Sequence, residues 1–352
     1  MQTILFVIPS LDYGGAARQL TLIAEGLPRD RFRPRVCVLG RDAPWAKELR
    51  ASGVEVDILG WKRSFDPAPF LALRRLAAGL RPDVVHLWGR TALRAGAALG
   101  GVRGVGRLFV SAAAAPGRRT PWPDRWLLRR AVVVAFGEAE ADRCRRLGVR
   151  PGRVAVVAPG VRPAPPPAEA VETPPGRLIL GVGPLRPRKG FRDAVWALDV
   201  LHYLYEDLRL ALVGDGPDRP RLEQFARTAQ VERRVIFTGR LPDPAPWLHA
   251  SEVVWVPSRV GGGVCAALEA MAAGRPVIAT RLPALAEIVV EGVGRLVPPG
   301  DKTELARQTR FLLNDPDRRR AYGAAGRRRA AEHFSVEGLV RRCAELYERG
   351  PT

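Results

Sequence analysis

Short apolar segments alternate with helix-like segments along the whole chain, and the alternation restarts after a proline-rich run. The apolar runs at 3–9, 83–88 and 178–182 are unbroken enough to form strands that are buried on both faces. Each run is followed by a stretch whose apolar residues recur at helical spacing. Alternation of this kind predicts parallel sheets covered by helices on both faces, and therefore an α/β protein.

The run APGVRPAPPPAEAVETPPGR, residues 158–177, separates the two series. Proline cannot continue a helix or the interior of a sheet, so this run makes a semi-rigid spacer. We predict a first domain at 1–160, a linker at 161–176, a second domain at 177–330 and a C-terminal helix at 331–352. A chain of 352 residues with 47% apolar content is long enough for two cores.

Several helices in the second half have predicted bounds that can be checked directly. We expect helices at Phe191–Tyr205 and Val264–Ala273, and a helical tail over 316–349 with a break near His333. Two doubly wound sheets would place ligand sites at the carboxyl ends of their strands. The turns after the strands are therefore where binding residues are sought.

The chain is strongly basic, with a formal net charge of +20. The excess is almost entirely arginine, since the lysines are only Lys47, Lys62, Lys189 and Lys302. A GC-rich coding sequence and attraction to anionic lipids or acidic substrates both explain this excess, and both interpretations stay open. A nucleic-acid partner is not expected, because no basic stripe is interleaved with stacking aromatic residues.

Cysteine usage and the N-terminus indicate a cytoplasmic protein. Cys37, Cys144, Cys265 and Cys343 lack the spacing of metal or disulfide frameworks, as expected in a reducing compartment. The N-terminus MQTILFVIPSLDYGG has no basic leader and is interpreted as a buried strand, not a signal peptide. No uninterrupted apolar stretch reaches the roughly 18 residues that a membrane span requires.

The segment PSRVGGGVCAALEAMAAGRP, residues 257–276, combines a strand end, a glycine-rich turn and a helix that carries Glu269. Glycines at 261–263 allow backbone N–H groups to approach a ligand that side chains would block. The helix that follows directs its unpaired N–H groups, near Val264 and Cys265, and its positive dipole end toward the same place. A diphosphate fits such a site.

This segment resembles the donor site of the family 4 retaining glycosyltransferases. The resemblance covers nearly the whole chain and implies the GT-B fold, in which two doubly wound parallel-sheet, Rossmann-like domains face a central cleft. It also implies that the C-terminal helices cross back to the first domain. The implied activity is transfer of a sugar from a nucleoside-diphosphate sugar to a hydroxyl acceptor, glycan or lipid-linked, with retention and without cofactors. No Asp-x-Asp motif of the kind that metal-dependent glycosyltransferases use is identified, so no metal is expected.

The family motifs carry over to particular residues of this chain. Lys189 lies in a matching Lys-Gly pair, which implies that it binds the leaving diphosphate, and Glu269 matches the glutamate that holds the ribose. These two are the expected catalytic residues. The expected donor and diphosphate contacts are Gly14, Gly15, Arg188, Gly262, Gly263, Val264 and Cys265. Further candidates are Arg18, His86, Arg186 and Arg240, and a packed neutral ring is the alternative for His86.

Four signature positions of the family are replaced in this chain. Gly261 stands where the family has its first glutamate, Pro184 where it has an arginine, and Pro159 where it has an asparagine. The strand end at 107–115 lacks the family's histidine. These changes leave an alternative, a catalytically impaired glycosyltransferase-like protein that acts as a partner subunit or sugar-nucleotide binder.

Two segments mix basic and aromatic residues as bilayer-interface helices do. They are RRTPWPDRWLLRR at Arg118–Arg130 and the stretch Trp61–Arg75. Peripheral contact with the inner face of the membrane is one interpretation, and packing of these side chains against a sheet is the other.

Overall fold

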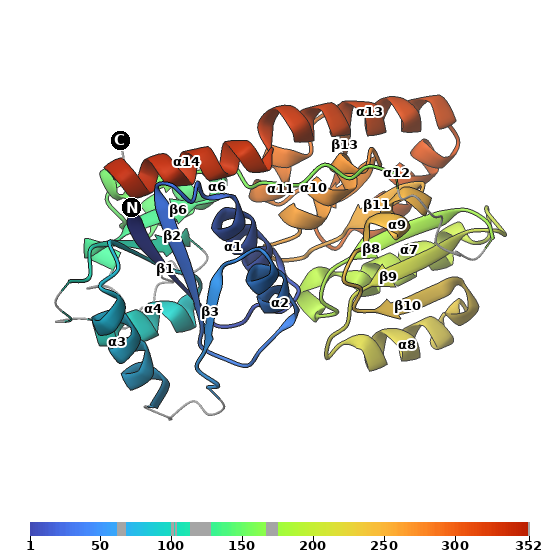
Figure 1. The fold of residues 1–352 in the computed structure, drawn as a ribbon. Coiled ribbons are helices and arrows are strands. Elements are labelled where there is room, and N and C mark those ends of the chain that lie inside the picture. Colours follow the sequence, from blue (N-terminus) through green and yellow to red (C-terminus); the bar gives the residue numbers. More distant parts are fainter. Residues whose placement is uncertain (62–67, 100–101, 103, 113–127, 167–174, 351–352) are drawn as a thin grey trace. The chain divides into compact units, whose positions relative to one another are not determined.

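The computed structural model describes residues 1–352 apart from 62–67, 100–101, 103, 113–127, 167–174 and 351–352. The chain divides into two compact units (Figure 1), each described here by itself. The first unit comprises Met1–Gly160 together with Val336–Thr352, and the second comprises Val161–Ser335.

The first unit is built on a seven-stranded sheet in the order β3-β2-β1-β4-β5-β6-β7. All neighbouring strands are parallel. The strands are β1 (Gln2–Ile8), β2 (Phe32–Val38), β3 (Glu55–Ile58), β4 (Val84–Leu87), β5 (Arg107–Ser111), β6 (Val132–Ala135) and β7 (Val154–Val156). The strand order reverses between β1 and β4, which is the position where ligands bind doubly wound sheets.

Helices cover both faces of this sheet. They are α1 (Gly15–Gly26), α2 (Pro44–Ala51), α3 (Ala68–Leu80), α4 (Arg90–Gly96), α6 (Glu138–Arg146) and α14 (Val336–Arg349), with short 3-10 turns η1 (Ala97–Leu99) and η3 (Pro151–Arg153). Because side chains alternate along a strand, β1 serves two cores. Phe6 lies in the core that includes α1 and α14 residues, whereas Leu5 lies in the core beneath α3, α4 and α6.

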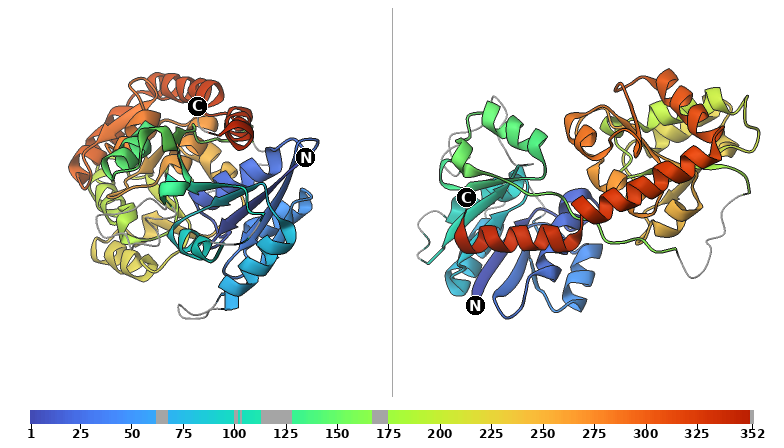
Figure 2. Two further views of the ribbon diagram at one scale, coloured as in Figure 1. Left: turned by 90° about the vertical axis from the view of Figure 1, so that its left-hand side faces the viewer. Right: turned by 90° about the horizontal axis from the view of Figure 1, so that it is seen from above.

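Helix α14 returns to the first unit after the chain has built the second, as Figure 2 shows. Leu339, Cys343 and Tyr347 are buried among β1 and β4 side chains. Val340 lies directly against Gly26 of α1, where a side chain larger than hydrogen would overlap it. The expected return of C-terminal helix to the first domain is thus confirmed, for α14 alone, since α13 belongs to the second unit.

The second unit has a six-stranded parallel sheet in the order β10-β9-β8-β11-β12-β13. Its strands are β8 (Leu178–Val182), β9 (Arg209–Val213), β10 (Val235–Gly239), β11 (Val253–Val256), β12 (Val277–Thr280) and β13 (Gly294–Val297). Here the order reverses between β8 and β11. The two doubly wound sheets that the sequence predicted are therefore confirmed.

The helices of the second unit also cover both faces of its sheet. They are α7 (Phe191–Leu201), α8 (Arg219–Thr228), α9 (Ala245–Ala250), α10 (Val264–Ala272), α11 (Pro283–Ile288), α12 (Lys302–Leu313) and α13 (Pro316–His333), with 3-10 turns η4 (Pro187–Lys189) and η5 (Glu232–Arg234). Residues of α10, α11 and α13 share one core, while residues of α7, α8 and α12 share the other.

Part of the arginine excess has a structural role in α13. Arg327 donates to the Ala273 carbonyl at the end of α10, and Arg329 donates to the Ile288 carbonyl at the end of α11. Arg319 donates to carbonyls in the last turn of α12. The last carbonyls of a helix have no partner inside the helix, so these guanidinium groups satisfy three helix ends at once.

The structure differs from the predicted helices at two places. The helix expected over Phe191–Tyr205 ends at Leu201, because the backbone N–H groups of Leu204 and Tyr205 both turn back to the Leu201 carbonyl. Helix α4, at Arg90–Gly96, was not predicted at all. The break in the helical tail is confirmed, since α13 ends at His333 and α14 begins at Val336.

Candidate donor-binding site in the second unit

The reversal of strand order in the second sheet brings two turns together. β8 and β11 are neighbours, and the turns that leave their carboxyl ends carry residues 183–190 and 257–263. The first turn leads into α7 and the second into α10. All the predicted donor residues of the second unit except Arg240 lie on these two turns or on α10.

The glycine turn has a backbone that side chains rarely adopt. Gly261, Gly262 and Gly263 have φ angles of +47°, +78° and +96°. A Cβ atom at Gly263 would also meet Val256, whereas one at Gly261 would meet nothing within 4 Å. Gly263 is the N-cap of α10 and makes no side-chain cap, so the positive end of this helix faces the glycine turn without a capping side chain from Gly263.

Lys189 lies on the other turn with its side chain directed at the glycines. Its Nζ atom would be 3.2 Å from a Cβ atom added to Gly262. Burial, followed by repulsion from Arg188, lowers the pKa of Lys189 below its ordinary value, and Cys265 partly offsets this. Within the described part of the chain its ammonium forms no hydrogen bond or ion pair. A half-buried cation without a counterion, facing a helix N-terminus, is an arrangement suited to an anion.

The two turns are joined through their backbones. The Arg188 carbonyl accepts a hydrogen bond from the Arg259 N–H at 2.8 Å. Gly190 has a φ of +71°, and a Cβ atom there would overlap the Pro257 carbonyl oxygen. The Lys-Gly pair is therefore explained residue by residue: the lysine supplies the charge, and the glycine allows the turns to approach.

Sequence reasoning missed a side-chain link between the same two turns. Arg259 donates from Nε and Nη2 to the two carboxylate oxygens of Asp193, at 2.9 Å and 2.6 Å. Asp193 lies in the first turn of α7, shortly after Lys189 in the sequence, and its side chain is only 7% exposed. The only sequence signal was a carboxylate in the first turn of a helix, which is common and carries no information about its partner.

The other predicted residues of this unit lie in more ordinary surroundings. Glu269 is half-buried on α10, and Cys265 is half-buried in the first turn of that helix. Arg186 and Arg188 are exposed on the turn after β8, and Arg240 is exposed just after β10. The turn can thus offer a diphosphate two exposed guanidinium groups beside the Lys189 ammonium.

The predicted residues of the first unit lie at its own reversal point. Gly14 and Gly15 are exposed at the start of α1, in the turn that follows β1. Arg18 lies one helical turn further on, with its guanidinium 4.8 Å from the centre of the Trp45 ring. Trp45 in turn packs edge-on against Tyr13. Aromatic contacts therefore help to hold this turn.

His86 is enclosed in the first core. Its ring is fully buried among Phe6, Trp88 and Phe109, and its Nδ1 atom shares a 2.8 Å hydrogen bond with the Tyr347 hydroxyl of α14. Burial lowers the pKa of His86 to about 3, so the ring is neutral. These contacts fit the packed neutral histidine and give no support to a ligand-binding role.

Buried polar side chains hold the backbone beside two of the replaced signature positions. Gly160, which follows Pro159, is held by the buried Gln19 side chain, whose amide donates to the Gly160 carbonyl at 2.8 Å and accepts from its N–H at 2.7 Å. Ser111, at the end of β5, accepts a hydrogen bond from the Gly89 N–H at 3.2 Å. Both side chains stabilise turns instead of facing a ligand.

One Asp-x-Asp triplet does occur, at Asp315-Pro316-Asp317, and the structure shows what it does. Asp315 caps α13 by accepting from the Arg318 N–H at 2.9 Å, and Asp317 pairs with Arg320 on the surface. The triplet begins a helix and does not follow a strand of the sheet. It is a capping motif.

The segments considered for membrane contact are described only in part. In Arg118–Arg130, residues 118–127 lie outside the described residues, while Leu128 is buried. In Trp61–Arg75, residues 62–67 lie outside them; Trp61 packs edge-on against Phe70, and Leu71 is 53% exposed. No described helix combines the length and the apolar content that crossing a membrane requires.

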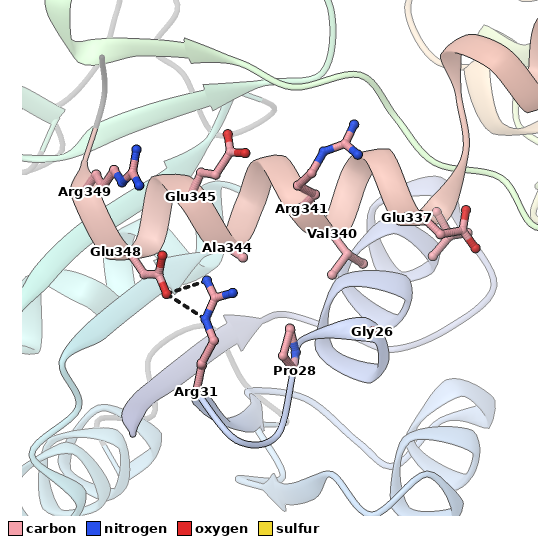
Figure 3. Close-up of a pocket in the computed structure, with 11 residues that line it drawn as sticks. Gly26, Pro28, Arg31, Glu337, Val340, Arg341, Ala344, Glu345, Glu348 and Arg349 are labelled. Carbon is pink, nitrogen blue, oxygen red and sulfur yellow. Dashed lines mark hydrogen bonds and ion pairs between the residues drawn. The ribbon is translucent and has the colours of Figure 1, made fainter.

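The first unit also has a groove of about 730 Å³ along α14, shown in Figure 3. Arg31, Arg341 and Arg349 line it together with Glu337, Glu345 and Glu348. Arg31 bridges the groove by its ion pair with Glu348. Equal numbers of both charges and this bridge are typical of an ordinary protein surface.

Comparison with known families matches both halves of the chain. The family described as Glycosyltransferase Family 4 matches residues 13–164, and the one described as Glycosyl transferases group 1 matches residues 176–315. The chain is 30% identical to the 2-deoxystreptamine N-acetyl-D-glucosaminyltransferase of Streptomyces fradiae, over 92% of its own length and 87% of that protein.

Other similarities cover less of the sequence or concern the fold. The lipopolysaccharide core biosynthesis glycosyltransferase LpsD of Rhizobium meliloti is 33% identical over 54% of the chain, which spans about half of that relative (55%). The crystal structure of Anabaena HepE in complex with UDP and glucose has a TM-score of 0.84 at 21% identity, covering 99% of this chain and all of that one (100%). The chain belongs to the family 4 glycosyltransferases and has their GT-B fold.

Proposed function

We propose that the protein is a retaining glycosyltransferase that binds a nucleoside-diphosphate sugar at the turns after β8 and β11. The observation that carries this proposal is the Lys189 ammonium, which is half-buried, has no partner among the described residues and faces the glycine turn before α10. A diphosphate would supply the missing negative charge and would accept hydrogen bonds from the first N–H groups of α10.

The remaining residues take roles that follow from their chemistry. Arg186 and Arg188 lie on the same turn as Lys189 and add positive charge where the family's arginine is replaced by Pro184. Glu269 lies further along α10, and its carboxylate would accept hydrogen bonds from the two ribose hydroxyls.

In the proposed reaction the bond between the sugar C1 and the diphosphate oxygen breaks, and the acceptor hydroxyl oxygen bonds to C1 on the same face. The hydroxyl proton passes to the departing phosphate oxygen, so configuration is retained without a protein nucleophile. Charge develops on the diphosphate, and Lys189 with the α10 N–H groups is placed to stabilise it. These groups fill the role that a divalent cation has in other enzymes, so we propose that the reaction needs no metal.

UDP binding to the purified protein tests the proposal first. Isothermal titration or thermal shift with UDP, GDP and ADP should show binding of one of these nucleotides. Lys189→Met should weaken that binding by about 10- to 100-fold, the worth of one charge-assisted hydrogen bond. Lys302→Met, which removes a lysine from α12 of the same unit, should leave the affinity unchanged. Equal affinity of Lys189→Met and the unaltered protein would reject the site.

The replaced first glutamate decides between turnover and binding alone. Gly261 faces open space at a φ of +47°, so Gly261→Glu fits sterically with a backbone strain of about 1 kcal/mol. Transfer of radiolabelled sugar to an added glycan acceptor, or to water, by the unaltered protein would establish the enzyme. Donor binding with turnover only in Gly261→Glu would instead favour the sugar-nucleotide binder.

The acceptor and the location follow from the relatives only by analogy. One relative acts in lipopolysaccharide core biosynthesis and another on 2-deoxystreptamine, so we propose a glycan or lipid-linked hydroxyl acceptor reached from the cytoplasm. Peripheral contact with the membrane is part of this proposal. Sedimentation with anionic vesicles at low and high salt tests it, because electrostatic adsorption weakens as salt is added.

A further inference from the structure

Three contacts join the two turns of the candidate donor site, although these turns are far apart in the sequence. Arg259 binds the Arg188 carbonyl through its N–H group and Asp193 through its guanidinium, and Gly190 packs directly against the Pro257 carbonyl. On its other side the turn after β11 is held by Thr280, whose hydroxyl donates to the Ser258 carbonyl at 2.6 Å. These contacts fix the turn up to Arg259.

Three consecutive glycines make the next part of this turn unusually permissive. Each glycine loses more backbone freedom on ordering than any other residue, so fixing the conformation of segment 261–263 has a high entropic cost. Lys189, however, must remain next to Gly262 for its ammonium and the α10 N–H groups to act on one ligand. Something outside the glycines has to hold the two turns in register.

We propose that the Asp193–Arg259 pair is a positioning device that holds Lys189 against the glycine turn and so preorganises the diphosphate site. The pair is bidentate, its carboxylate is almost completely buried, and each partner is adjacent to one of the two turns. Bidentate geometry fixes orientation as well as distance, which a lysine in place of Arg259 would not do. The inference rests on the proposed donor site, since it assigns how that site is held.

The alternative role of the pair is general stabilisation of the second unit. The two roles predict different behaviour of Lys189. Asp193 lies in the first turn of α7, where any carboxylate favours the helix dipole. A purely structural role would lower the stability of the second unit without altering Lys189. The positioning role predicts a change at Lys189 itself.

Lys189 can be observed directly because the chain has only four lysines, Lys47, Lys62, Lys189 and Lys302. Reductive ¹³C-methylation of the full chain gives one NMR signal for each lysine, and Lys189→Arg identifies the one of interest. Without any ligand, the Lys189 signal in the unaltered protein should titrate below the value of about 10.4 that a solvated lysine has.

The variants Asp193→Asn and Arg259→Gln then decide the question. If the pair positions Lys189, both changes release the turn, and both move the Lys189 pKa upward toward its ordinary value. A direct charge effect would act in opposite directions, because one variant loses an anion and the other a cation. The double variant should match each single one, since the interaction can be lost only once. Opposite shifts, or no shift in either variant, would overturn the proposal.

An ion pair of the same chemistry in the same unit provides the control. Arg307 binds Glu304 bidentately on α12, at 2.6 Å and 2.7 Å, without joining two turns. Glu304→Gln and Arg307→Gln should leave the Lys189 signal unchanged. Arg259→Lys, which keeps the charge and loses the fork, should behave like Arg259→Gln.

Nucleotide affinity extends the test without being needed for it. On unmethylated protein, Asp193→Asn and Arg259→Gln should each weaken binding of the nucleotide identified above by about tenfold, while the Glu304–Arg307 controls stay within about twofold. Absence of nucleotide binding in the unaltered protein would defeat the proposed function. The Lys189 titration would still decide whether the pair positions the lysine.

Discussion

The two units share one strand order, yet their reversal points use polar residues in opposite ways. In the first unit two buried side chains near β1 and β4 bond inside the core: His86 bonds Tyr347 through Nδ1, and Gln19 bonds Gly160, while the Nε2 atom of His86 has no hydrogen-bond partner. In the second unit Lys189 is left without a partner among the described residues, facing glycines and a helix N-terminus. A half-buried charge without a partner indicates a place for an anionic ligand, whereas neutral polar groups bonded inside a core hold the fold together.

This contrast indicates that the sheet topology places a turn where a ligand can bind, and that the residues at the strand ends determine whether this turn suits an anion. Both sheets place a glycine turn at the carboxyl end of their first strand, as doubly wound sheets do. Among the residues that the structure describes, only those of the second unit combine such a turn with a half-buried ammonium and a second turn joined to it. The predictions below test that contrast, from the largest expected effect to the smallest.

Gly190→Ala should have the largest effect, because the added methyl group overlaps the Pro257 carbonyl and the residue has a φ of +71°. We expect the second unit to lose about 3 kcal/mol or more of its free energy of unfolding, together with nucleotide binding. Urea unfolding measures the first effect. Gly292→Ala is the matched control, since its φ is +80° but its Cβ atom meets nothing within 4 Å; a similar loss in both variants would refute the close approach of the turns.

Gln19→Ala should destabilise the first unit by about 2–3 kcal/mol, because the buried N–H and carbonyl of Gly160 lose their partners together. Nucleotide affinity should be unaffected. Gln308→Ala is the comparison in the second unit: Gln308 is also buried, but its partners Arg295 and Glu304 can bind water instead. Equal losses of stability in the two variants would show that the hydrogen bonds between Gln19 and Gly160 contribute no more than those of Gln308.

His86 should make the first unit sensitive to acid. Its pKa is about 3 in the folded chain and about 6.5 in the unfolded chain, so the unfolded state takes up the proton first as pH falls below 6.5. Stability is therefore lost between these two values, by about 2 kcal/mol at pH 5 relative to neutral pH. Denaturant unfolding of His86→Gln, an uncharged replacement, should lack this part of the pH dependence; identical profiles would contradict it.

Lys189→Met should have the smallest effect on stability and the opposite sign. Removing a half-buried cation that has no counterion among the described residues should stabilise the second unit by up to about 1 kcal/mol while nucleotide binding is weakened. Thermal unfolding with and without nucleotide measures both. A destabilised variant would indicate that Lys189 has a structural partner after all.

The same lysine predicts how binding depends on pH. The pKa of Lys189 is lowered in the free protein, and an anionic ligand would raise it again, so nucleotide affinity should fall as pH rises through the lowered value. Titrations between about pH 7 and pH 10 should show this decline, and Lys189→Arg should not show it, because arginine stays charged. A flat profile for both proteins would exclude Lys189 from the site.

Much of the fold could be predicted because local sequence patterns indicate its strands and helices. The apolar runs at 3–9, 83–88 and 178–182 match β1, β4 and β8 to within one residue at each end. Helix α4 was not predicted, and the helix predicted at Phe191–Tyr205 was longer than α7. Both errors lie where the sequence has no clear signal for the start or the end of a helix. The motifs predicted the glycine turn, Lys189 and Glu269 as site residues, and the structure places Lys189 beside Gly262.

The sequence by itself determined the two doubly wound units, the turns that carry the donor residues and the residues that the family motif requires. Only the tertiary structure decided that His86 is enclosed by α14, that Gln19 holds Gly160, and that Arg259 joins Asp193 across 66 positions of the chain. The reason is physical. Periodicity records how each residue meets its own helix or strand, whereas the partner of a polar side chain depends on which distant segments the fold brings together.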